Sequence, residues 1–209
     1  MHHLDSMCKA MKHCVSAPKQ GLLIKPSRCW DGNPEFEHAV HGTSDADHSK
    51  DPDTHRSVGG RSTFLNDSPA VQKSNMFEHV ALSATKLDLV SAAHCAQDML
   101  FAMRVVESMG LKVKKPMLLH VDNKGTKDLA NNWSCGGRTR HVQARQFFLR
   151  ELKEQSPIHT VWKSGEENES DPFAKNLSGA KCDKHTSACC GADQHVKGDS
   201  QLEEGVRGE

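Results

Sequence analysis

Apolar and polar residues alternate in the section of the chain that begins at Phe36. The alternation forms three short runs, which end at Asp47, Leu65 and Leu82. A period of two is typical of strands that bury one face. Polar turns rich in Asp, Ser and Pro separate the runs, so we expect three strands that pair in antiparallel order.

A helical period replaces this alternation after Leu82. The sequence from Ser83 to Gly110 predicts one long amphipathic helix, because its apolar residues recur every three or four positions. Ser83 or Thr85 would be the N-cap, and Gly110 would end the helix. Asp88 lies one residue before the apolar stripe, so we expect it at the edge of the packed face, near the sheet and reachable by solvent. The stripe consists of Leu89, Ala92, Ala93, Ala96, Met99, Leu100, Met103 and Val106.

Short apolar runs and amphipathic segments share the second half of the chain. Two of the runs predict buried strands, Met117–Val121 and Ile158–Trp162. Helical spacing predicts helices at about 126–131, 139–154 and 166–177. A strand, helices and a second strand in this order imply a right-handed crossover between parallel strands. The chain therefore predicts an α/β fold with a mixed five-stranded sheet, in which two parallel strands follow three antiparallel ones, and with helices on both faces.

The composition restricts the class of protein. A chain of 209 residues with 36% apolar residues and a mean hydropathy of −0.64 has room for one domain with a modest core. Lys and Arg together number 27, as do Asp and Glu, so nucleic-acid binding would depend on local basic clusters. We find no signal peptide and no stretch of membrane-spanning length, and therefore expect an intracellular protein whose eight cysteines are reduced.

Asp122 directly follows the predicted strand Met117–Val121 and precedes Asn123. Ligand sites in open α/β sheets form outside the carboxyl ends of the strands, which makes this carboxylate a candidate site residue. A single acid at the end of a strand is more often a turn or helix-cap residue. Asp122 on its own therefore leaves both interpretations open.

Five motifs follow one another in order between Gly21 and Gly179. They are Ser44-Asp45-Ala46-Asp47 with the hairpin up to Gly60, Val80–Leu89, Val121-Asp122-Asn123, Arg138–Glu151 and Ser170–Leu177. In this order they resemble the RNase H domain of copia-type retrotransposon Pol polyproteins. The resemblance implies an RNase H-like domain at 36–179, preceded at 1–35 by a remnant of the end of the reverse transcriptase. We expect residues 180–209 to form a disordered tail, because they are rich in Gly, Asp and Glu and show no periodicity.

The resemblance also implies a metal-dependent nuclease site. The matching positions are Asp45, Asp88, Asp122 and Asp171, which would be the catalytic residues and the ligands of two Mg²⁺ ions, with Mn²⁺ as a substitute. Oxygen ligands suit such hard cations. The implied reaction is endonucleolytic hydrolysis of the RNA strand of an RNA–DNA hybrid, which leaves 3′-hydroxyl and 5′-phosphate ends.

Basic residues in and before the second amphipathic helix would bind the phosphates of the hybrid. They are Arg138, Arg140, His141, Arg145 and Arg150. The other implied partner is the reverse transcriptase domain of the same polyprotein, and the implied place of action is the cytoplasm or a virus-like particle. Nothing in the sequence predicts a membrane partner or a small-molecule substrate.

Several residues depart from the family pattern and favour a first alternative, a catalytically dead RNase H-fold domain with at most weak nucleic-acid binding. Asp88 replaces a Glu and is one methylene shorter, Lys86 stands where the family usually has an acid, and Gln143 replaces an acid in the basic helix. Pro172 follows Asp171 directly, and a helix tolerates such a proline only in its first turn.

A second alternative concerns the end of the chain. A small metal-binding adaptor would use Cys and His residues there as zinc ligands. The candidates are Cys182, His185, Cys189, Cys190 and His195. Their spacing fits no closed structural zinc pattern well, so an unstructured segment with coincidental cysteines is the competing interpretation.

Overall fold

The computed structural model describes most of the chain between Ile24 and Leu177. The described ranges are 24–48, 56–78, 83–131, 140–155 and 157–177, with isolated positions towards both ends, and the side chains of 140–143 are excluded. The strands are β1 (Glu37–His38), β2 (Val40–Asp47), β3 (Val58–Leu65), β4 (Ser68–Met76), β5 (Lys112–Val113), β6 (Met117–Val121) and β7 (Ile158–Trp162). The helices are α2 (Ala84–Ser108), α3 (Lys124–Asn131), α4 (Arg140–Glu154), the 3₁₀ turn η1 (Gly165–Glu167) and α5 (Asp171–Ala174).

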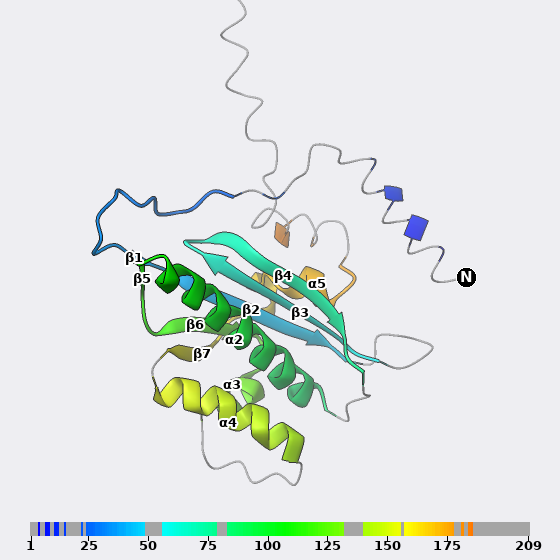
Figure 1. Cartoon of the computed structure of the whole chain (residues 1–209). Helices are drawn as coiled ribbons and strands as arrows, with labels where there is room; N and C mark the ends of the chain where they lie inside the picture. Colours follow the sequence, from blue (N-terminus) through cyan, green and yellow to red (C-terminus); the bar gives the residue numbers. More distant parts are fainter. Residues whose placement is uncertain are drawn as a thin grey trace, which may run out of the picture.

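Five strands form one mixed sheet in the order β4-β3-β2-β6-β7 (Figure 1). β2 pairs antiparallel with β3 and β3 with β4, whereas the pairs β2–β6 and β6–β7 are parallel. The predicted arrangement of three antiparallel strands followed by two parallel ones is therefore confirmed. β1 and β5 form a separate two-stranded parallel sheet, which the sequence did not predict because strands of two residues show no periodicity.

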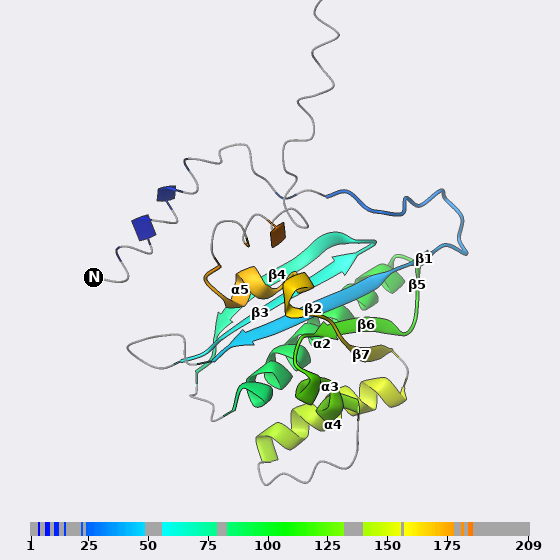
Figure 2. The same cartoon turned by 180° about the vertical axis from the view of Figure 1, so that it is seen from behind.

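Helices cover both faces of the sheet, as expected. α2 lies against one face with α4 packed beside it, and α5 lies on the opposite face (Figures 1 and 2). The strands β2 and β6, which are neighbours in the centre of the sheet, end beside the N-terminal part of α2. The candidate functional site lies at this end of the sheet.

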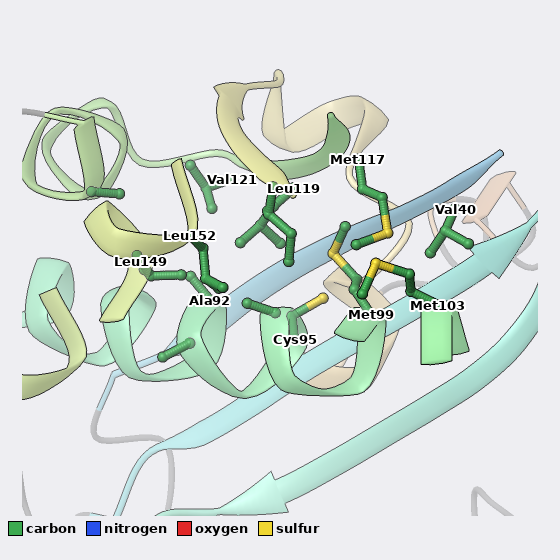
Figure 3. Close-up of a cluster of buried hydrophobic side chains, with 14 of the residues drawn as sticks. Val40, Ala92, Cys95, Met99, Met103, Met117, Leu119, Val121, Leu149 and Leu152 are labelled. Atoms are coloured by element: carbon green, nitrogen blue, oxygen red, sulfur yellow. The ribbon is translucent and has the colours of Figure 1, made fainter. Parts of the chain in front are cut away.

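The hydrophobic core lies between α2, α4 and the sheet (Figure 3). Met117, Leu119 and Val121 alternate along β6 and are buried in this core, whereas Leu118 between them is 41% exposed. Successive side chains of a strand point to opposite faces. The same alternation turns Asp122, the next residue, away from the core and towards the face that carries α5.

The long helix and the central strand agree closely with the sequence prediction. α2 begins after the N-cap position Ser83 and ends before Gly110, whose φ of 78° is accessible to glycine at low steric cost. β6 spans the predicted Met117–Val121. The third strand is different, because β4 ends at Met76 rather than at Leu82, and the segment before Leu82 lies partly outside the described residues.

The predicted helix at 166–177 is wrong. The structure has a 3₁₀ turn at Gly165–Glu167 and a single α-helical turn at Asp171–Ala174. Asp171 is the first residue of that turn and Pro172 the second, where the missing N–H of proline removes no helical hydrogen bond. The helix therefore begins late, and this makes Asp171 compatible with the proline that follows it.

Asn66 and Asp67 form the turn between β3 and β4, with φ values of 49° and 64°. Two positive φ values in succession are typical of the type I′ hairpin turn, which favours Asn. The Asn66 side chain also holds the residue directly before β2, because its Oδ1 accepts a hydrogen bond from the Ala39 N–H (2.8 Å). Asn66 therefore supports both the turn and the start of β2.

We expect Asn66→Ala to lower the free energy of unfolding by about 2 kcal/mol, because it loses this hydrogen bond and keeps a β-carbon in the left-handed region without the polar group that favours it there. Asn66→Gly removes the steric cost and should lose about half as much. Urea unfolding of the two variants measures both effects. Equal stability of Asn66→Ala and the unchanged protein would contradict this account of the turn.

Candidate functional site

Three carboxylates meet at one edge of the sheet. Asp45 lies near the end of β2 and Asp122 directly follows β6, and these neighbouring strands run parallel, so both acids reach the same edge. Asp88 comes from the second turn of α2. One oxygen of each acid lies within 4.8 Å of the oxygens of the other two. The structure thus brings together three of the four acids that the sequence motifs selected.

Two of these acids are nearly inaccessible to solvent, since Asp45 is 2% exposed and Asp88 is 7% exposed. Asn123 Nδ2 donates to Asp88 Oδ2 (2.8 Å), while Asn123 Oδ1 accepts the Gly125 N–H (2.9 Å) at the start of α3. Asp88 Oδ1 has no hydrogen-bond partner in the part of the chain that the structure describes. A buried carboxylate oxygen without a donor is costly, and a divalent cation would satisfy it.

Asp171, the fourth predicted acid, lies beside this group together with a lysine. Lys175 Nζ is 2.8 Å from Asp171 Oδ1, 2.9 Å from Asp45 Oδ2 and 3.8 Å from Asp122 Oδ2. Sequence reasoning did not single out Lys175. The signal that could have found it is the spacing of four between Asp171 and Lys175 in the last motif, since residues four apart in a helix lie on one face.

Buried polar contacts hold α5 over β2. Asn168 Nδ2 donates to the Ser44 carbonyl (3.1 Å), and Ser170 Oγ donates to Asn168 Oδ1 (2.7 Å). Both Asn168 and Ser170 are almost completely buried. These contacts fix the position of Asp171 relative to Asp45, although the two residues lie far apart in the sequence.

The acids border an open cavity of about 360 Å³. Its lining residues are Asp45, Ala46, Asp88, Asp122, Asn123, Lys124 and Lys175. Lys86, which replaces an acid of the family, does not line this cavity. Because the cavity is open to solvent and almost entirely polar in its lining, a charged backbone can approach the carboxylates from outside.

Burial raises the pKa of all three clustered acids. It raises the pKa of Asp88 to about 6, despite the opposing effect of the hydrogen bond from Asn123, and it also raises the pKa of Asp122. Burial likewise raises the pKa of Asp45, against the opposing effect of the Lys175 ammonium. The neighbouring carboxylates add to these increases. A divalent cation among these acids would favour their ionised forms.

The ion-free protein is expected to lose stability as Asp88 ionises. Its carboxyl has a pKa of about 3.8 when unfolded and about 6 when folded, so the folded state holds the proton more tightly. This contribution is fully present below about pH 4 and is lost as the pH rises through 6, by up to about 1 kcal/mol per pH unit. Asp88→Asn should therefore flatten the pH dependence of stability. Urea unfolding with EDTA from pH 4 to 7 measures this, and an unchanged slope would contradict the raised pKa of Asp88.

The predicted nucleic-acid residues lie in α4 and just before it. Arg138 is outside the described residues, and only the backbone of Arg140 and His141 is described. Arg145 is half-buried on α4. In Figures 1 and 2 the N-terminal end of α4 lies on the same side of the molecule as the N-terminal end of α2, which carries Asp88. The backbone of Arg140 and His141 therefore lies at the end of α4 that is on the same side as Asp88.

Phosphate binding by Arg150, as the sequence resemblance implies, requires an exposed side chain, but Arg150 is buried. It is 4% exposed, and its Nε donates to the Leu129 carbonyl of α3 (3.1 Å). Arg150 therefore joins two helices inside the protein and does not lie on a surface that a phosphate can reach.

Four of the five zinc-ligand candidates of the second alternative lie outside the described residues. These four are Cys182, Cys189, Cys190 and His195. His185 is described and is 6% exposed. Within the described ranges, Asp45, Asp88 and Asp122 form the only cluster of His, Cys, Asp or Glu that could hold a metal ion.

None of the described helices is both long and apolar enough to cross a membrane.

Comparison with known proteins finds relatives among transposon polyproteins, although no family model matches the chain. The chain is 24% identical over 176 residues to the retrovirus-related Pol polyprotein from transposon RE1 of Arabidopsis thaliana, covering 84% of this chain and 12% of that protein. It is 25% identical over 147 residues to the retrovirus-related Pol polyprotein from transposon TNT 1-94 of Nicotiana tabacum. This match covers 70% of this chain and 11% of that protein. The chain thus spans about 12% of the length of the curated relatives that it matches.

Solved structures with a similar chain path include two RNase H enzymes. RNase H1 from Halobacterium salinarum NRC-1 has 12% sequence identity and a TM-score of 0.45, over 65% of this chain and 94% of that chain. LC11-RNase H1 in complex with an RNA/DNA hybrid has 8% sequence identity and a TM-score of 0.49, over 65% of this chain and 93% of that chain.

The relatives confirm the resemblance that the five sequence motifs carry. The strand order and the strand directions confirm the predicted RNase H-like fold. Over most of its length the chain is thus similar to retrovirus-related Pol polyproteins from plant transposons, and its sheet has the strand order of the predicted RNase H-like fold.

Proposed function

We propose that this chain is an RNase H domain that cleaves the RNA strand of an RNA–DNA hybrid with Mg²⁺, leaving 3′-hydroxyl and 5′-phosphate ends. The observation that carries this proposal is the meeting of Asp45, Asp88 and Asp122, with one oxygen of each within 4.8 Å of the others, at the edge of this mixed sheet. Homology to Pol polyproteins supports the class of reaction.

The donor set fits magnesium, with manganese as a substitute. The clustered donors are carboxylate oxygens, as hard cations require. Asp45, Asp88 and Asp122 would hold one ion, and Asp45 and Asp171 would hold a second one beside it. When bound, the two ions would activate the attacking water and stabilise the leaving 3′-oxygen. The protein contributes three clustered acids from separate elements, with Asp171 beside them, and Asn123 fixes the orientation of Asp88.

The hybrid would approach across the open cavity beside the acids. Lys124 lines this cavity, and Arg140, His141 and Arg145 belong to α4, whose N-terminal end lies on the same side of the molecule (Figure 2). With Arg138, which precedes α4, these cationic side chains would bind backbone phosphates. Phosphate contacts of this kind fix register and orientation rather than sequence, so we expect cleavage with little sequence preference.

The relatives also support a proposal about the larger protein. We propose that residues 36–179 are the RNase H-like domain, that 1–35 are a remnant of the end of a reverse transcriptase and that 180–209 are a tail beyond the domain. The matched relatives are polyproteins of which this chain spans a small part. A reverse transcriptase domain of the same polyprotein is therefore the proposed protein partner.

A cleavage assay tests the proposed activity. RNA labelled at its 5′ end and annealed to DNA is incubated with the protein and Mg²⁺, beside the same RNA as a single strand and as an RNA duplex. We expect internal cleavage of the RNA in the hybrid alone, abolished by EDTA, with product 3′ ends that a polymerase can extend. Absence of hybrid cleavage across the range of Mg²⁺ and Mn²⁺ concentrations would contradict the proposal.

Two observations favour a second function, a catalytically dead domain that binds nucleic acid weakly. Lys175 already places a positive charge among Asp45, Asp122 and Asp171, and Asp88 is one methylene shorter than the Glu of the family. A ligand that binds the folded state raises the melting temperature. Hybrid binding without cleavage, together with a melting temperature that Mg²⁺ does not raise, would favour this second function.

A further inference from the structure

The acidic site contains two adjacent places for a cation, and the ammonium of a lysine fills one of them. At the first place, Asp45, Asp88 and Asp122 bring three oxygens within 4.8 Å of one another. At the second, Lys175 Nζ lies 2.9 Å from Asp45 and 2.8 Å from Asp171. Asp45 belongs to both places, so whatever occupies one of them affects the other.

The backbone at Lys175 is fixed, whereas the end of its side chain can move. Lys175 directly follows α5, and its backbone N–H donates to the Asp171 carbonyl (2.8 Å). The Asn168 side chain donates to the Ser44 carbonyl of β2 and so anchors this turn. The Lys175 side chain is 31% exposed, whereas Asp45 is 2% exposed. The ammonium can therefore turn towards solvent on its flexible stem while the carboxylates stay in position.

An ammonium and a divalent ion cannot share the second place. Both require the oxygens of Asp45 and Asp171, and their positive charges would repel each other at a separation of about 4 Å. Without any cation, the clustered carboxylates would repel one another. The Lys175 ammonium relieves that repulsion in the ion-free protein, so its departure has a free-energy cost that a divalent ion must offset.

We propose that Lys175 is a built-in counter-ion that holds one of the two cation places until a divalent ion displaces it. This inference rests on the metal site proposed above. The first divalent ion would bind among Asp45, Asp88 and Asp122. The second would bind only at higher concentration, because it must break the ion pairs of Lys175 with Asp45 and Asp171. Lys175 thus sets the metal concentration at which the site becomes fully loaded.

Binding of Mn²⁺ to the full chain tests this inference without using activity. The EPR signal of free Mn²⁺ counts the bound ions and gives their affinities for the unchanged protein, for Lys175→Met and for the control Lys163→Met. Met keeps an unbranched stem of similar length and removes the charge. Lys163 pairs with Glu169 outside the acidic cluster, and its side chain is 22% exposed.

We expect the second Mn²⁺ to bind at least about tenfold more tightly to Lys175→Met, because two charge-assisted hydrogen bonds no longer have to be broken. Lys163→Met should bind both ions as the unchanged protein does. Equal affinity for the second ion in all three proteins would overturn the role of Lys175 and leave the metal site standing.

Two further results separate this inference from the proposed function. If none of the three proteins binds Mn²⁺, the proposed metal site is wrong, and the role of Lys175 falls with it. If Lys175→Met does not fold, as a thermal melt with EDTA would show, Lys175→Gln provides the same comparison with a polar side chain. We expect the same gain in affinity for the second ion in Lys175→Gln. No gain in affinity would overturn the proposed role of Lys175.

Discussion

Asp122→Asn is expected to reduce Mg²⁺-dependent cleavage of the hybrid at least about a hundredfold. The substitution keeps the size of the side chain but removes a charge that lies close to Asp45 and Asp88. Changes in residues that merely support metal ligands cost about 10- to 100-fold, and a change in a ligand costs more. Single-turnover cleavage at saturating protein measures the loss in the chemical step separately from product release.

Asp128→Asn is the matched control for this experiment. Asp128 is also an acid in the region after β6, but it lies on α3, is 58% exposed and pairs with Lys127 at 3.6 Å. Loss of such a surface ion pair changes little, so we expect cleavage within about twofold of the unchanged protein. Similar rates for Asp122→Asn and Asp128→Asn would mean that the activity does not depend on the acidic site.

Gly60→Ala is expected to cause the second large effect, a loss of cleavage of at least about tenfold together with roughly 1–3 kcal/mol of stability. Gly60 lies on β3 beneath α5. A β-carbon there would lie 2.6 Å from the Ser170 carbonyl oxygen and 2.6 Å from the Ala174 nitrogen. Both neighbours are backbone atoms, so the short helix must move, and it carries Asp171 and Lys175 with it.

Gly59→Ala, one residue earlier on the same strand, separates crowding in general from displacement of α5. A β-carbon at Gly59 would meet the Phe77 ring at 2.5 Å, and a side chain can rotate away where a backbone cannot. We therefore expect Gly59→Ala to lose stability in urea unfolding but to keep its cleavage rate while folded. Full activity of Gly60→Ala would contradict the account of α5 as the support of Asp171.

Strands and the long helix could be predicted from the sequence because their patterns are local. Met117–Val121 alternates between a buried and an open face, and the apolar stripe of α2 recurs at helical spacing. The short helix at Asp171 could not be placed in this way. It is anchored by the hydrogen bond from Asn168 to the Ser44 carbonyl, a contact between residues 124 positions apart, and no local pattern contains such a contact.

The acids of the site were found through the motif resemblance, because periodicity identifies a strand end without showing what the acid there does. Lys175 was missed because its ammonium reaches Asp45 only after α5 has folded against β2. Arg150 was misassigned for a related reason. A helical pattern does not reveal that a long side chain folds inward and donates to the Leu129 carbonyl of a neighbouring helix.

Anomalous scattering from Mn²⁺ in crystals of the protein would test most directly whether these acids form a metal centre. The account predicts an anomalous peak roughly 2.0–2.5 Å from carboxylate oxygens of Asp45, Asp88 and Asp122. At higher Mn²⁺ concentration it predicts a second peak beside Asp171, with the Lys175 ammonium turned away. Crystals that bind Mn²⁺ only at other places, with the three acids still together, would contradict it.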